Sequence, residues 1–114
     1  MINEEKLRLR FMRDPLEKRI GNLAATLGRI SSSARDSNTP STVVDLLDEA
    51  KHLIEWTSAE AESETAAEFV QIQRLIILWQ KSWEVAFTQK SQRILLATQA
   101  KEWSENVLQR SGLL

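Results

Sequence analysis

Residues 65–86, which read TAAEFVQIQRLIILWQKSWEVA, decide the fold. Apolar side chains recur in this stretch every three or four positions, which is the repeat of an α-helix and not of a β-strand. The stripe consists of Phe69, Ile72, Ile76, Trp79, Trp83 and Ala86. Further apolar residues occupy the neighbouring faces, and a helix that is apolar over most of its circumference is normally central. We therefore expect a helix over 65–88 that forms the hub of an all-α fold.

Three other segments carry one apolar stripe each with the same helical spacing. The helices that they predict span residues 14–34, 40–56 and 92–110. Asp14 and Pro15 suit the start of the first of these helices, because Asp is a favoured N-cap and Pro fits the first helical position.

The connection between the last two helices is marked only by a slip in the phase of the stripe. Continuing the stripe of 65–88 would place Lys90 and Arg93 on the core face. We therefore place a turn at 88–92. The alternative is one continuous helix over 65–110, about 70 Å long, which would imply an antiparallel dimer.

The composition agrees with a single helical domain over residues 1–114. This length supports one core, and the chain has three Gly, two Pro and no Tyr, which is unlike a sandwich or barrel of many turns. Short connections favour antiparallel neighbours, so we predict an up-and-down four-helix bundle with a short N-terminal arm or helix over residues 1–13. A strand is the alternative for the arm, because apolar and basic residues alternate there.

Cysteine is absent, which excludes disulfides and thiolate metal sites. The longest apolar run, Leu75 to Trp79, is far shorter than the ~20 residues that a membrane span needs. We expect a cytoplasmic protein without a membrane partner. The net charge is −1, but residues 1–35 and 69–114 are basic whereas residues 36–68 are strongly acidic.

Glu49 and His52 match half of the paired Glu-x-x-His motif that binds di-iron centres in helical bundles. The chain has one His, so a second copy of the motif cannot come from the same chain. At about 100° per residue, both side chains lie off the apolar stripe of their helix. We expect an exposed histidine beside an acid.

Two pairs of carboxylates one helical turn apart are the other candidates for metal chemistry: Asp45 with Asp48, and Glu102 with Glu105. Mg²⁺ prefers several oxygen ligands, so a carboxylate–metal hydrolase is one alternative function, and the least supported. All four side chains project away from the stripe of their own helix, whereas a site in a bundle core needs inward-pointing ligands. We predict no catalytic residue, no metal site and no cofactor.

The N-terminal segment carries a candidate basic patch that consists of Lys6, Arg8, Arg10 and Arg13. These cations suit the phosphates of a nucleic acid, and a small nucleic-acid-associated regulator is one alternative function. We favour a different interpretation, in which the apolar residues of the segment cap one end of the bundle. The arginines would then face the acidic stretch 55–68, in the same chain or in a partner copy.

Two features point to a protein interface. Gly21, Ala25 and Gly28 form a small-residue face, which is easiest to understand if another helix of this chain or of a second copy approaches closely. Trp56 lies off the stripe of its helix, so it is either an exposed interface residue or covered by the N-terminal arm or the acidic stretch. We expect a non-catalytic interaction or regulatory module that binds a second copy or another protein.

Overall fold

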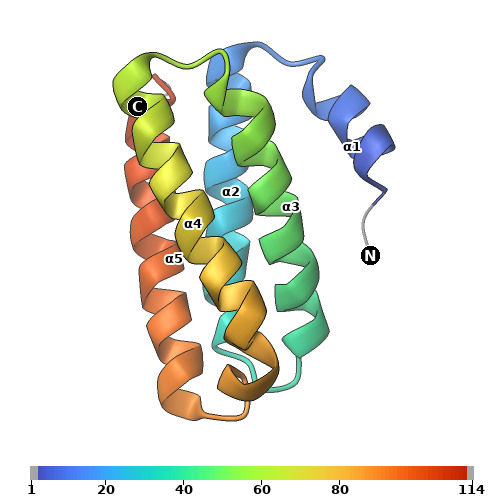
Figure 1. Cartoon of the computed structure of the whole chain (residues 1–114), viewed down its shortest axis with the longest axis vertical. Helices are drawn as coiled ribbons and strands as arrows, with labels where there is room; N and C mark the ends of the chain where they lie inside the picture. Colours follow the sequence, from blue (N-terminus) through green and yellow to red (C-terminus); the bar gives the residue numbers. More distant parts are fainter. Residues whose placement is uncertain (1–2, 113–114) are drawn as a thin grey trace.

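The computed structural model describes residues 3–112, which contain five α-helices and no strand. The helices are α1 (Glu4–Phe11), α2 (Leu16–Ala34), α3 (Pro40–Ser58), α4 (Ser63–Ala86) and α5 (Lys90–Arg110). The four long helices lie side by side, with consecutive helices running in opposite directions, and α1 lies on the outer side of α3 (Figure 1). The all-α prediction is confirmed, and the N-terminal segment is a fifth helix, not a strand. Within the described residues, no helix is both long and apolar enough to cross a bilayer.

The long helices begin and end within two residues of the predicted boundaries. Pro15, and not Asp14, is the N-cap of α2, and it supplies no side-chain cap bond. Gln89 has an extended backbone and separates α4 from α5, so the prediction of a turn is confirmed and the alternative of one helix over 65–110 is wrong.

The most completely buried helix is α2, so the prediction that 65–88 forms the hub is wrong. Leu23, Leu27 and Ile30 of α2 are completely buried, and this helix packs against both α3 and α5. On α4, by contrast, Leu78 is 59% exposed and Val85 is 67% exposed. The additional apolar faces of α4 point outward. The prediction failed because the sequence of one helix does not specify how many neighbouring helices it has.

Small residues let α2 and α5 approach closely. The Ser104 hydroxyl of α5 donates to the Ala24 carbonyl of α2 at 2.7 Å, and the Ser31 hydroxyl of α2 donates to the Ala97 carbonyl at 2.7 Å. A Cβ on Gly28 would lie 3.4 Å from the Ser104 Oγ, at the tight limit of ordinary contact. Part of the predicted small-residue face is therefore covered by a helix of the same chain.

Candidate functional site

Trp56 is buried beneath α1, with 9% of its surface exposed. Its indole packs between Phe11, with ring centroids 6.1 Å apart, and His52, with ring centroids 5.6 Å apart. Leu7 and Phe11 share the inner face of α1, because residues four apart lie one above the other on a helix. Two other apolar residues of the segment stay exposed: Leu9 (64%) and Met12 (37%). The segment therefore packs beside α3 and does not cap the bundle, and Trp56 is not an exposed interface residue.

The start of α1 is fixed by its own sequence. The Asn3 side chain accepts a hydrogen bond from the Lys6 backbone N–H at 3.1 Å, which is an N-cap. Glu4 and Glu5 occupy the first turn, where carboxylates interact favourably with the positive end of the helix dipole. This cap places Glu4 on the first turn of α1, from which its side chain reaches α3.

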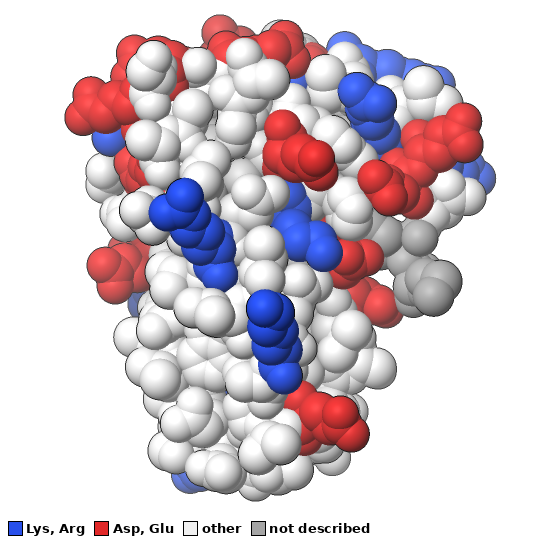
Figure 2. Space-filling view, in the orientation of Figure 1, with Lys and Arg blue, Asp and Glu red and all other residues white. Residues whose placement is uncertain are grey.

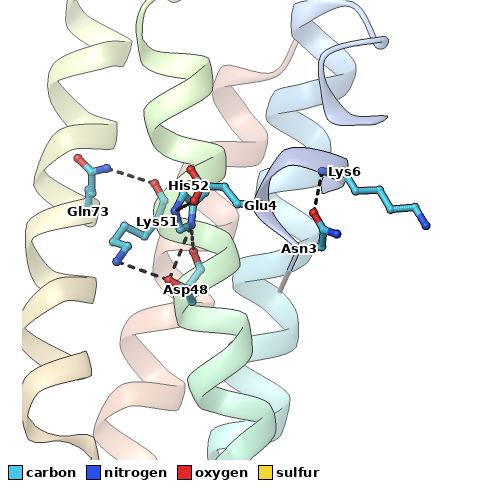
Figure 3. Close-up of polar contacts among 7 residues, drawn as sticks. All are labelled: Asn3, Glu4, Lys6, Asp48, Lys51, His52 and Gln73. Carbon is cyan, nitrogen blue, oxygen red and sulfur yellow. Dashed lines mark hydrogen bonds and ion pairs between the residues drawn. The ribbon is translucent and has the colours of Figure 1, made fainter. Parts of the chain in front are cut away.

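A polar cluster around His52 joins α1, α3 and α4 (Figure 3). The imidazole Nδ1 lies 2.8 Å from the Asp48 backbone carbonyl, and Nε2 lies 3.4 Å from a Glu4 carboxylate oxygen. The Lys51 ammonium lies 3.5 Å from the Asp48 carboxylate, and the Gln73 side-chain amide of α4 donates to the Lys51 carbonyl at 3.2 Å. The His52 side chain is only 15% exposed, so the prediction of an exposed histidine is wrong. The wheel position was correct, but α1 covers that side of α3.

A cavity of about 430 Å³ lies between α1 and the α2–α3 pair. Its apolar lining includes Leu7, Phe11, Ala25 and Leu53, and its charged lining includes Arg10, Asp14, Arg29 and Glu49. Arg29 lies 3.5 Å from the Glu49 carboxylate, which also accepts a hydrogen bond from the Thr26 hydroxyl at 3.4 Å. Ala25 therefore faces this cavity, whereas Gly28 faces α5 and Gly21 is half-buried. The structure does not unite the three residues in one contact.

The candidate basic patch consists of Lys6, Arg8, Arg10 and Arg13, and all four side chains are exposed. Within residues 3–112, none of them forms an ion pair. The acidic stretch instead pairs with cations of the bundle. Arg19 lies 2.6 Å from Glu60, and Arg110 lies 3.0 Å from Glu68. The prediction that the arginines of the arm face the acidic stretch is therefore wrong, because α1 lies beside α3 and not over that end.

Arg19 fixes the segment that connects α1 to α2. Its side chain is 6% exposed and donates to the Asp14 backbone carbonyl at 3.0 Å and to Glu60 at 2.6 Å, and its guanidinium lies 3.4 Å from the Met12 sulfur. The hydrogen bond from Arg19 and its positive charge hold the pKa of Glu60 below the ordinary value, against a smaller opposing effect of desolvation. The sequence offered no signal for this contact, because the partners are 41 positions apart.

The carboxylate pairs do not assemble into a metal site. Asp45 and Asp48 lie on α3, whereas Glu102 and Glu105 lie on α5. Across residues 3–112, no group of three or more His, Asp or Glu side chains has an arrangement that would hold a metal ion. Nothing in this geometry supports the hydrolase alternative.

Five of the exposed large apolar side chains lie on α4 and α5, which are joined by a hydrogen bond of 2.8 Å from the Trp79 indole to the Gln99 side chain. We call the group the α4–α5 strip, and its residues are Leu75 (40% exposed), Leu78 (59%), Val85 (67%), Ile94 (41%) and Leu95 (44%). Figure 2 shows that the lower half of the face in view, where α4 ends, carries few charged side chains. The strip is the largest group of exposed apolar side chains on neighbouring helices within residues 3–112.

Comparisons of the chain with protein-family models, with curated proteins and with solved structures found no match.

Proposed function

We propose that this chain is a non-catalytic interaction module that forms a homodimer through the α4–α5 strip. The observation that carries the proposal is the exposure of five large apolar side chains on two neighbouring helices. In this proposal α2 to α5 act as an up-and-down four-helix bundle that presents the strip, and α1 is an accessory element.

A second copy is the occupant that suits the strip best. A two-fold dimer brings the same surface of both copies together, so a charged surface would meet its own charge. The five strip residues are uncharged, although the exposed cations Arg74 and Lys81 lie one helical turn on either side of Leu78. Burying apolar area is favourable by roughly 25 cal/mol per Å². Five side chains per copy make a small interface, for which we expect reversible association at about micromolar concentrations or above.

The test is the oligomeric state, measured by sedimentation equilibrium from about 1 µM to several hundred µM. We expect the wild-type mass to rise towards that of a dimer. The double variant Leu78→Gln/Val85→Gln should weaken association at least about tenfold, which corresponds to about 1.4 kcal/mol. Val44→Gln is the matched control, because Val44 is 50% exposed on α3, outside the strip. A wild-type monomer throughout, or equal weakening by the control, would contradict the proposal.

A second candidate function, association with nucleic acid, is favoured by the absence of ion pairs at the basic patch. Phosphates would supply the missing acceptors, and binding would weaken steeply with salt. Alanine at all four positions of the patch should abolish retention on duplex or single-stranded nucleic acid. The control variant changes four exposed cations of the bundle to alanine: Arg74, Lys81, Lys90 and Lys101. Equal retention by the two variants would exclude this function.

A further inference from the structure

We propose that His52 is a pH-dependent clamp for α1. Its imidazolium form fastens the N-terminal end of α1 to α3, and its neutral form releases that end. This inference concerns the movement of α1 and does not rest on the proposed dimer, whose strip lies on α4 and α5.

The geometry at His52 satisfies both ring nitrogens only when both carry a proton. The Asp48 backbone carbonyl can only accept, so the contact of 2.8 Å requires a proton on Nδ1. A neutral ring then has a bare Nε2, whose lone pair faces the Glu4 carboxylate at 3.4 Å. The other neutral tautomer would set a bare Nδ1 against the Asp48 carbonyl. Each neutral form therefore loses one favourable contact, whereas the imidazolium keeps both the hydrogen bond to the Asp48 carbonyl and the charge attraction to Glu4.

The charges that surround the ring favour the same form. Glu4 approaches from α1, and the Asp48 carboxylate lies 3.7 Å from Nδ1 on α3 itself. Lys51 pairs with Asp48 at 3.5 Å and offsets part of that negative charge. Gln73 is the polar contribution of α4 to this cluster, and it is uncharged. Lys51 offsets Asp48, so the negative charge of Glu4 is the one left unbalanced beside His52.

The two ends of α1 are held by different forces. Phe11 packs on Trp56 at the C-terminal end, and this apolar contact does not titrate. Glu4 contacts His52 at the N-terminal end, and histidine is the residue that titrates between about pH 5 and pH 8. Loss of the proton should let the N-terminal half of α1 move away from α3 about the anchor at Phe11. A second hollow, which Asn3, Lys6, Leu7 and Arg10 line together with Glu49 of α3, would then open together with the main cavity.

The direction of the effect follows from the proton. The clamp is closed when the imidazole carries its second proton and opens when that proton is lost, so lower pH favours the docked state of α1. The Glu4 side chain is 61% exposed, so solvent screens the contact. Exposed ion pairs contribute little to stability. We therefore expect the ratio of docked to undocked α1 to change about two- to fivefold between the two protonation states of His52.

The experiment is amide hydrogen exchange by NMR on the intact chain at about pH 5.5 and about pH 7.5, with rates divided by the intrinsic rate at each pH. We expect the amides of α1 to be about two- to fivefold more protected at the lower pH, while protection in α2 and α5 stays constant. His52→Gln and Glu4→Gln should both remove this pH dependence.

Glu5→Gln is the matched control. Glu5 lies beside Glu4 in the first turn, is exposed, and forms no ion pair within the described residues. The control should keep the wild-type dependence on pH. Equal protection of wild-type α1 at the two pH values would overturn the clamp. So would a loss of pH dependence in Glu5→Gln as large as that in Glu4→Gln, because the effect would then reflect the general charge of α1.

Discussion

The contact between α2 and α5 and the contact between α1 and α3 represent two ways of joining helices in this molecule. The first is made by small side chains and by serine hydroxyls that donate to backbone carbonyls of the facing helix. The second depends on Phe11 and Leu7, with the Glu4–His52 contact at its edge and a cavity of about 430 Å³ beside it. We therefore expect α1 to undock more readily than α2, with Phe11 and Trp56 as the core residues that undocking would expose.

The largest expected effect is that of Leu27→Ala in α2. Leu27 is completely buried, so the change removes a packed side chain and leaves a cavity. We expect the free energy of unfolding to fall by about 2–5 kcal/mol, measured by chemical denaturation. A loss below about 1 kcal/mol would show that the centre of the bundle relaxes around the cavity and would remove the contrast with α1.

A smaller global effect is expected for Phe11→Ala, although Phe11 is 5% exposed. If α1 undocks while the long helices stay folded, global stability should fall by less than about 1 kcal/mol. The local effect should be large: the amides of α1 should lose protection and the Trp56 indole N–H should exchange faster. A global loss as large as that of Leu27→Ala would make α1 part of the cooperative core.

The smallest effect is expected from Glu60→Gln, and it depends on pH. Folding lowers the pKa of Glu60 because Arg19 stabilises the carboxylate. The stabilisation is therefore present above the ordinary pKa of about 4.5 and is lost as the pH falls through the lower pKa of the folded state. Glu60→Gln should reduce the fall in melting temperature between neutral pH and about pH 3.

Glu102→Gln is the control for this change, because Glu102 is exposed and forms no ion pair within residues 3–112. The control should leave the acid-induced fall in melting temperature as it is in the wild type. An equal change in both variants would mean that acid acts through the general charge of the chain and not through the contact between Arg19 and Glu60.

The sequence was sufficient for the four long helices because each of them carries its own apolar period. The stripe of Phe69 to Ala86 and the phase slip before Lys90 are local patterns, and both predict the observed elements. Neighbours are not encoded locally, so the pattern of α4 predicts a hub although α2 is the more completely buried helix. A helix with three apolar faces can turn any of them to solvent, as Leu78 and Val85 show.

The candidate site was harder to predict because it consists of contacts between distant segments. Trp56 and His52 were placed correctly on the side of α3 away from its stripe, but the sequence did not show which segment covers them. The N-terminal segment was one of the alternatives for Trp56, and it is the one that the structure contains. The partner of His52 was missed, because Glu4 is an ordinary first-turn acid until α1 is placed beside α3.

Whether α1 opens separately from the bundle can be measured by amide hydrogen exchange in increasing, sub-denaturing concentrations of denaturant, because this gives the opening free energy of each helix in the intact chain. We predict that the buried amides of α2 and α5 exchange only through global unfolding. The amides of α1 should exchange through a local opening. Its free energy should be several kcal/mol below that of global unfolding and close to that of a fraying helix end. If α1 exchanges with the same free energy and the same denaturant dependence as α2, the division of the molecule into a core and a detachable helix is wrong.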